Sequence, residues 1–106
     1  MALVMLYVTH ADMESAEAMC SILLEERLIA CANLFDIDSM YRWNGELANE
    51  SEVVSLLKTE QRMADELEAR IEKLHPYDTP CIIRIPVNAN PGYERWVEEQ
   101  CGGEDG

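Results

Sequence analysis

The hydrophobic and polar positions of the chain alternate between strand-like and helix-like patterns. Residues 2–8 are apolar throughout and predict a first strand. Asp12 then caps a helix whose apolar positions recur at helical spacing to about residue 29. Between residues 33 and 43 apolar and polar side chains fall on opposite sides, as in a strand. Asn44-Gly45 favours a tight hairpin turn, and a return strand extends from residue 46 to about residue 58.

A second helix, a fourth strand and a last helix follow the hairpin. Residues 63–74 carry an apolar stripe at helical spacing, residues 80–87 predict a strand, and Pro91 begins a short helix. The order β-α-β-β-α-β plus a terminal helix predicts an α+β fold, the ferredoxin-like sandwich, with the first and third strands in the middle of the sheet. We expect one domain over residues 1–100 and a disordered acidic tail over residues 101–106.

The first strand is apolar on both faces, which indicates self-association. Its side chains divide evenly between the faces, with Leu3, Met5 and Tyr7 on one and Val4, Leu6 and Val8 on the other. Two helices cover only one face of a four-stranded sheet, and a sheet face in water normally carries polar residues. Another copy of the chain must therefore cover the second face, so we expect an oligomer.

The length of the hairpin supports this expectation. Its arms, residues 33–43 and 46–58, are about twice the usual strand length of ~5–6 residues, so the sheet cannot pair with all of them. The unpaired part ends in Tyr41 and Trp43, aromatic residues of the kind enriched in interface cores. We expect both in the subunit interface. The alternative is a mobile, exposed hairpin tip.

Charge and composition exclude several classes of protein. Acidic residues outnumber basic ones by 21 to 8, and the resulting net charge of −13 repels the phosphates of nucleic acids. No segment approaches the roughly 20 consecutive apolar residues of a membrane span, and the apolar first strand lacks the basic region and cleavage site of a signal peptide. Without a secretion signal, we expect reduced thiols in the cytoplasm at all the cysteines, namely Cys20, Cys31, Cys81 and Cys101.

Four sequence motifs resemble one protein family. They are ACANL at 30–34, YRWNGE at 41–46, LLKT at 56–59 and HPYDTP at 75–80. In this order and at these intervals they are similar to the CutA divalent-cation tolerance proteins, over residues 3 to about 100. The resemblance implies a ferredoxin-like protomer and a tight homotrimer, similar in architecture to the PII signalling proteins. It also implies a cytoplasmic role in the tolerance of copper and other divalent metals.

The resemblance also points to metal-ligand positions. Family members that bind copper use a cysteine at the end of the first strand and two histidines directly before the Pro-Tyr pair. In this chain those positions hold Val8, Leu74 and His75, so that only His75 keeps a ligand. In addition, Cys81 stands where many relatives carry a glutamate.

The remaining imidazole and thiol groups complete the candidate metal site. His75, His10, Cys31 and Cys81 carry the side chains that Cu²⁺ or another divalent cation would use, because copper favours imidazole and sulfur ligands. His10 lies two residues after Val8 and therefore faces the same way along an extended strand. The alternatives are a histidine that only ends a helix, where imidazole is favoured, and cysteines that are small buried hydrophobic residues.

A different kind of site would lie in clefts between subunits. The resemblance to PII-like trimers implies such clefts, which bind small anions or nucleotides in those proteins. Lys58 ends a central strand and could hold a carboxylate or phosphate, and Thr9, Tyr77 and Trp43 could line the cleft. The alternative is a solvated lysine beside packed aromatic residues.

Sequence signatures of enzymes are absent. The chain contains no Gly-rich phosphate loop, no HExxH and no nucleophile elbow. We therefore predict a non-enzymatic homotrimer that binds divalent metal weakly, copper first, near His75-Pro76-Tyr77. The rival hypotheses are a PII-like sensor of a small organic ligand and a purely structural trimer with an indirect effect on metal tolerance.

Overall fold

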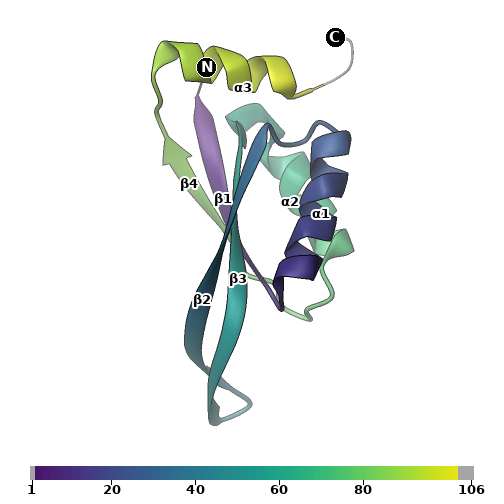
Figure 1. Cartoon of the computed structure of the whole chain (residues 1–106), viewed down its shortest axis with the longest axis vertical. Coiled ribbons are helices and arrows are strands. Elements are labelled where there is room, and N and C mark those ends of the chain that lie inside the picture. The colour runs from purple at the N-terminus through teal and green to yellow at the C-terminus, as the bar shows by residue number, and fades with distance from the viewer. Residues whose placement is uncertain (1, 103–106) are drawn as a thin grey trace.

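The computed structural model describes residues 2–102 and confirms the predicted α+β, ferredoxin-like order (Figure 1). The strands are β1 (Leu3–His10), β2 (Cys31–Trp43), β3 (Glu46–Glu60) and β4 (Ile82–Val87). The helices are α1 (Met13–Glu25), α2 (Ala64–Leu74) and α3 (Pro91–Gln100), and a 3-10 turn (Gln61–Met63) precedes α2. The side chain of Asp12 accepts a hydrogen bond from the Ser15 N–H and caps α1, as predicted.

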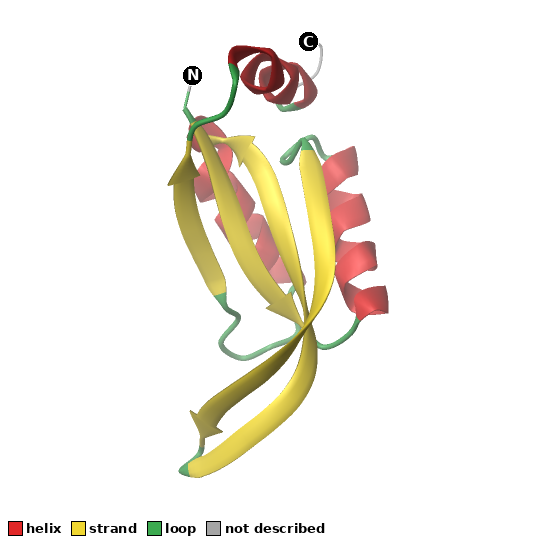
Figure 2. Ribbon diagram, turned by 60° about the vertical axis from the view of Figure 1, so that its left-hand side comes forward, coloured by secondary structure: helices red, strands yellow, loops and turns green. Residues whose placement is uncertain are grey.

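The sheet is antiparallel with the strand order β2-β3-β1-β4, so the first and third strands are central, as predicted. β1 pairs with residues 53–60 of β3, whereas β2 pairs with β3 along its whole length. Among the described residues, 46–52 therefore pair only with 37–43. This two-stranded segment, which we call the hairpin overhang, extends beyond the body of the molecule and ends in a turn with positive φ at Asn44 and Gly45 (Figures 1 and 2).

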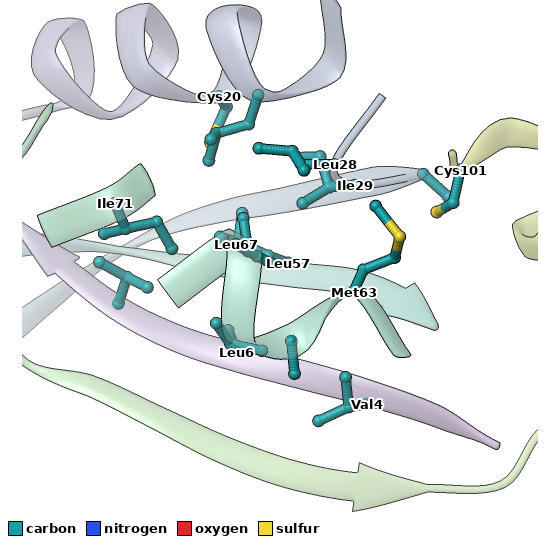
Figure 3. Close-up of a cluster of buried hydrophobic side chains, with 14 of the residues drawn as sticks. Val4, Leu6, Cys20, Leu28, Ile29, Leu57, Met63, Leu67, Ile71 and Cys101 are labelled. Atoms are coloured by element: carbon teal, nitrogen blue, oxygen red, sulfur yellow. The ribbon is translucent and has the colours of Figure 1, made fainter. Parts of the chain in front are cut away.

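The hydrophobic core lies between the sheet and the helices α1 and α2, which cover one of its faces (Figure 2). Val4, Leu6 and Val8 of β1 point into this core and are almost completely buried. Figure 3 shows side chains from β1, β3, α1 and α2 meeting there, with the Cys101 side chain at one end. Burial of each large aliphatic side chain stabilises the fold by roughly 1.5–3 kcal/mol.

α1 ends earlier than the apolar spacing predicted. Arg27 adopts a left-handed conformation (φ 59°) after the last helical turn. Its N–H donates to the Leu24 carbonyl at 3.1 Å, and the Leu28 N–H donates to the Leu23 carbonyl at 3.1 Å, which are the two bonds of a Schellman motif. Leu28 and Ile29 continue the apolar pattern to residue 29 because they enter the core after the helix has ended.

The turn at Arg27 is joined to the end of the chain. Its carbonyl accepts the Gly102 N–H at 2.9 Å, and its guanidinium donates to the carbonyls of Glu99 and Gly102. Cys101, where the predicted tail begins, is buried, and its sulfur lies 3.2 Å from the Thr59 hydroxyl. Of the segment for which we predicted disorder, residues 103–106 lie outside the described residues.

The opposite face of the sheet, called the open face below, has no helix layer apart from α3 at one end (Figure 2). The strand register places mainly apolar side chains on it, namely Met5, Tyr7, Phe35, Ile37, Leu56, Ile83 and Ile85. Phe35 is 41% exposed and Ile83 is 51% exposed. The prediction that the sheet is apolar on both faces is therefore correct.

Candidate functional site

Two histidines meet where β1 ends and α2 ends. His10 is the last residue of β1, and His75 follows α2 directly. Both side chains are buried, and their rings stack at a centroid distance of 5.5 Å with an interplanar angle of 22°. Both residues were predicted from the sequence as candidate metal ligands. They are 65 residues apart in the chain, and the fold brings them together.

Both ring nitrogens of His75 have partners. Nε2 donates to the Thr9 carbonyl at 2.7 Å, because a carbonyl oxygen can only accept. Nδ1 is then the unprotonated nitrogen and accepts the Tyr77 N–H at 3.2 Å. These bonds explain the local structure, since Pro76 prevents the helix from continuing and the imidazole holds the loop against β1.

His10 has one bonded and one free nitrogen. Nε2 lies 2.7 Å from the Ser55 hydroxyl, and no described residue bonds Nδ1. Since no buried side-chain nitrogen or oxygen of the described residues lacks a partner, Nδ1 reaches solvent. Burial and the neighbouring charge of His75 lower the pKa of His10 from 6.5 to about 4, against a smaller opposing effect of Glu52. His10 is therefore neutral at pH 7.

A cavity of about 270 Å³ opens beside the two imidazoles, between the end of β1, α1 and the end of α2. His10 and His75 line it together with Ser15, Met19 and Leu74. Leu74 and Val8 occupy the positions at which the resemblance to the copper-binding family members implies metal ligands. Their surroundings differ, because Leu74 borders the cavity while Val8 is fully buried in the core.

Tyr77 and Cys81 lie at the same end of the sheet. The Tyr77 hydroxyl donates to Glu52 Oε2 at 2.8 Å and ties the loop to the base of the hairpin overhang. Burial and this carboxylate raise the pKa of Tyr77 far above its ordinary value. The Cys81 thiol is half-buried and hydrogen-bonded to the Thr9 side chain, and burial raises its pKa as well.

The other predicted site residues lie elsewhere. Cys31 is opposite Lys58 in the β2–β3 register, and Lys58 is opposite Met5, at the far end of β1 from His10. Five residues of strand, roughly 17 Å, separate these positions, so Cys31 does not join the imidazoles in one protomer.

The residues proposed for a ligand cleft are likewise dispersed within one chain. Thr9 and Tyr77 lie beside His75, and Lys58 is at the α3 end of the sheet. Tyr41 and Trp43 are in the hairpin overhang, where they are 39% and 52% exposed. Only an arrangement of several copies could bring this set together.

Sequence reasoning missed three neighbours of the imidazoles: Met19, Glu52 and Ser55. Ser55 gave a signal, because it is the one polar residue in the apolar run VVSLL and faces the helices. Glu52 and Met19 gave none, since an acidic residue at a strand end and a methionine on a helical stripe are ordinary features. Within the described part of the chain, no three His, Cys, Asp or Glu side chains gather closely enough to hold a metal ion.

The fold and the site define a small ferredoxin-like α+β protein with a buried pair of imidazoles beside a cavity and a long projecting hairpin. No helix in residues 2–102 is both long and apolar enough to cross a membrane.

Comparisons with known proteins identify the family. The model of the CutA1 divalent ion tolerance proteins matches residues 4–100, and the chain belongs to this family of non-enzymatic tolerance proteins. It is 46% identical over 99 residues to the divalent-cation tolerance protein CutA of Pyrococcus horikoshii, covering 92% of this chain and 97% of that protein.

Solved structures agree. The crystal structure of Pyrococcus horikoshii CutA1 is similar with a TM-score of 0.92 at 44% identity, over 94% of this chain and 99% of that one. A structure described as the periplasmic divalent cation tolerance protein CutA from Archaeoglobus fulgidus is similar with a TM-score of 0.90 at 31% identity, over 92% and 97% of the two chains.

Proposed function

We propose that this CutA-family chain, a single domain over residues 1–100, acts in divalent-cation tolerance as a cytoplasmic homotrimer. It binds copper or another divalent cation weakly at His10 and His75, next to the Pro76-Tyr77 loop. The observation that carries the proposal is the stacked pair of buried imidazoles, with a free His10 Nδ1 at a cavity.

The donor set fits a weak site. His10 can offer Nδ1 without losing a bond while Ser55 holds Nε2, and a partner on the second nitrogen is usual for histidine ligands. His75 can offer Nδ1 only if the 3.2 Å bond from the Tyr77 N–H breaks. Cys81 at this end of the sheet must first lose a proton that its raised pKa retains. Two imidazoles without a third fixed ligand give low affinity.

The trimer is supported by the surface that one chain leaves uncovered. Half-exposed apolar side chains spread over the open face, and the hairpin overhang projects beyond the fold that supports it. Additional copies of the chain would bury both features. Because the first and third strands remain central in each copy, association need not disturb the core.

The cytoplasm is supported by the cysteines. All four are free, and they lie at separate places in the fold with Cys20 and Cys101 buried. Free thiols are typical of a reducing compartment. A relative described as periplasmic shows that family membership alone does not assign the compartment.

Isothermal titration with Cu²⁺ tests the metal site. We expect His75→Ala and His10→Ala each to weaken binding by about tenfold, the effect of losing one of two ligands. Cys31→Ser is the matched control, because Cys31 lies at the other end of the sheet, and it should bind like the wild type. Equal affinities of the wild type and both histidine variants would remove the imidazoles from the proposal.

A further inference from the structure

A second cavity, of about 280 Å³, lies at the α3 end of the open face, far from the imidazoles. One wall is β1 and β3, with Met5 and Lys58, and the other is the segment from Val87 through Asn88 to Tyr93. Apart from Lys58, Asn88 and the Tyr93 hydroxyl, its lining is apolar. The pocket therefore combines one cation and one amide with hydrophobic walls.

Lys58 is unusual among the cations of this protein. Arg62, Arg70 and Arg84 each have a carboxylate partner, at 2.7 to 2.9 Å. Among residues 2–102, Lys58 has no carboxylate partner and only the ring of Tyr93, whose centroid is 5.7 Å from Nζ. It is half-buried, whereas the other cations without a carboxylate or carbonyl partner are exposed, namely Arg42, Lys73 and Arg95.

The absence of an acidic partner stands out in a chain with 21 acidic residues. The next carboxylate on the same face of β3, Glu60, is held by Arg62 through bonds of 3.0 and 2.8 Å. Glu94 in α3 accepts the Ala89 N–H at 3.3 Å. A half-buried ammonium group loses part of its hydration, and without a counterion no ion pair replaces the lost hydration free energy. An anion that enters the pocket would supply this ion pair.

The ring of Tyr93 is held in place for this contact. Its hydroxyl is hydrogen-bonded to Cys31, and its ring packs against Trp96 at a centroid distance of 5.6 Å. The aromatic wall is therefore preorganised beside Lys58, which reduces the entropy lost when a ligand binds.

We infer that this pocket binds a small organic monocarboxylate with a short apolar body. Lys58 holds the carboxylate with help from the Asn88 amide, and Leu3, Met5, Val87 and Tyr93 contact the body. A volume of about 280 Å³ admits only a small molecule, since typical ligand pockets measure roughly 300–1,000 Å³. A single cation without a cluster of backbone N–H groups favours one negative charge over phosphate. The site is independent of the metal proposal.

A titration of the assembled ¹⁵N-labelled protein with butyrate tests this inference by NMR. We expect saturable shifts of the backbone amides of Asn88, Ala89, Asn90, Gly92 and Tyr93, with little change near His75. Lys58→Met keeps the apolar stem but removes the charge, and it should weaken butyrate binding about tenfold or more, the effect of one charge-assisted hydrogen bond. Lys58→Arg should retain binding. Lys73→Met removes the only other lysine, which is exposed, and should behave like the wild type.

Two further probes separate charge from apolar contact. Butyramide has the same shape without the charge and should bind at least about tenfold more weakly than butyrate, and inorganic phosphate should not produce the saturable shifts. Equal binding of butyrate by Lys58→Met and the wild type would overturn the inference. So would the absence of shifts in the assembled protein, which would mean that another copy fills the pocket.

Discussion

The neutral, buried imidazole of His10 should make the protein sensitive to mild acid. Its pKa lies at about 4 in the fold against an ordinary value of 6.5, so the unfolded chain takes up a proton at a pH where the folded chain does not. The stability contributed by neutral His10 is complete above pH 6.5. It falls as the pH is lowered towards 4, where the folded imidazole is protonated as well.

The magnitude follows from the two pKa values. The complete effect is about 3 kcal/mol, and between pH 7.5 and pH 5 it is about 2 kcal/mol. The causes are burial and the charge of His75, which Glu52 partly offsets.

Urea unfolding at pH 7.5, 6 and 5 measures the effect, with EDTA present and one protein concentration throughout, since the proposed subunit association would make stability concentration-dependent. Carboxylates also titrate in this range, so the informative quantity is the difference between the wild type and His10→Gln. The glutamine keeps a hydrogen-bonding group for Ser55 and does not titrate. The wild type should lose about 2 kcal/mol more than His10→Gln between pH 7.5 and 5.

Parallel pH profiles for the wild type and His10→Gln would refute the reasoning. They would mean that folded His10 takes up its proton as readily as unfolded His10. Burial of the ring, the largest cause of the lowered pKa, would then not hold it in a neutral state.

Three further predictions concern stability and assembly. Thr59→Val removes the buried 2.8 Å hydrogen bond from the Thr59 hydroxyl to the Leu28 carbonyl and should lower the free energy of unfolding in urea by about 1–3 kcal/mol. An unchanged free energy would mean that a water molecule donates a hydrogen bond to this carbonyl in the variant. Leu67→Ala, at a fully buried position, should lower it by about 2–5 kcal/mol, and a loss below 1 kcal/mol would mean that the core collapses onto the gap. Light scattering should give the wild type a mass of three times 12.1 kDa, and Phe35→Glu on the open face should have a lower mass. Leu24→Glu on the exposed side of α1 is the control and should keep the full mass. A monomeric wild type would refute the trimer.

The sequence was sufficient to predict the order of the elements and the central strands. The reason is that each element depends on local patterns: the Asp12 cap, the Asn44-Gly45 turn and the uniformly apolar first strand. The end of α1 could not be predicted in this way. Apolar spacing reports burial, and Leu28 and Ile29 are buried in a loop as completely as they would be in a helix.

The candidate site was predictable only in part. His10 and His75 could be named because imidazoles are rare in this chain, but their hydrogen bonds depend on tertiary contacts with Thr9 and Ser55 that no local pattern encodes. Cys31 was named for its chemistry, and its place in the sheet register separates it from both histidines. Lys58 was named as a residue that could hold an anion, but the Asn88 and Tyr93 wall of its pocket could not be foreseen, since it depends on where the last helix packs.

The hairpin overhang has a consequence for solubility in acid. In a chain released from the proposed trimer, its strands carry backbone donors and acceptors along free edges, which are able to pair with strands of other chains. Asp38, Glu46 and Glu50 lie along this segment and repel like-charged neighbours at neutral pH. Near the isoelectric point of about 4.3 the net charge of the chain is close to zero, so aggregates of released chains should grow from the hairpin.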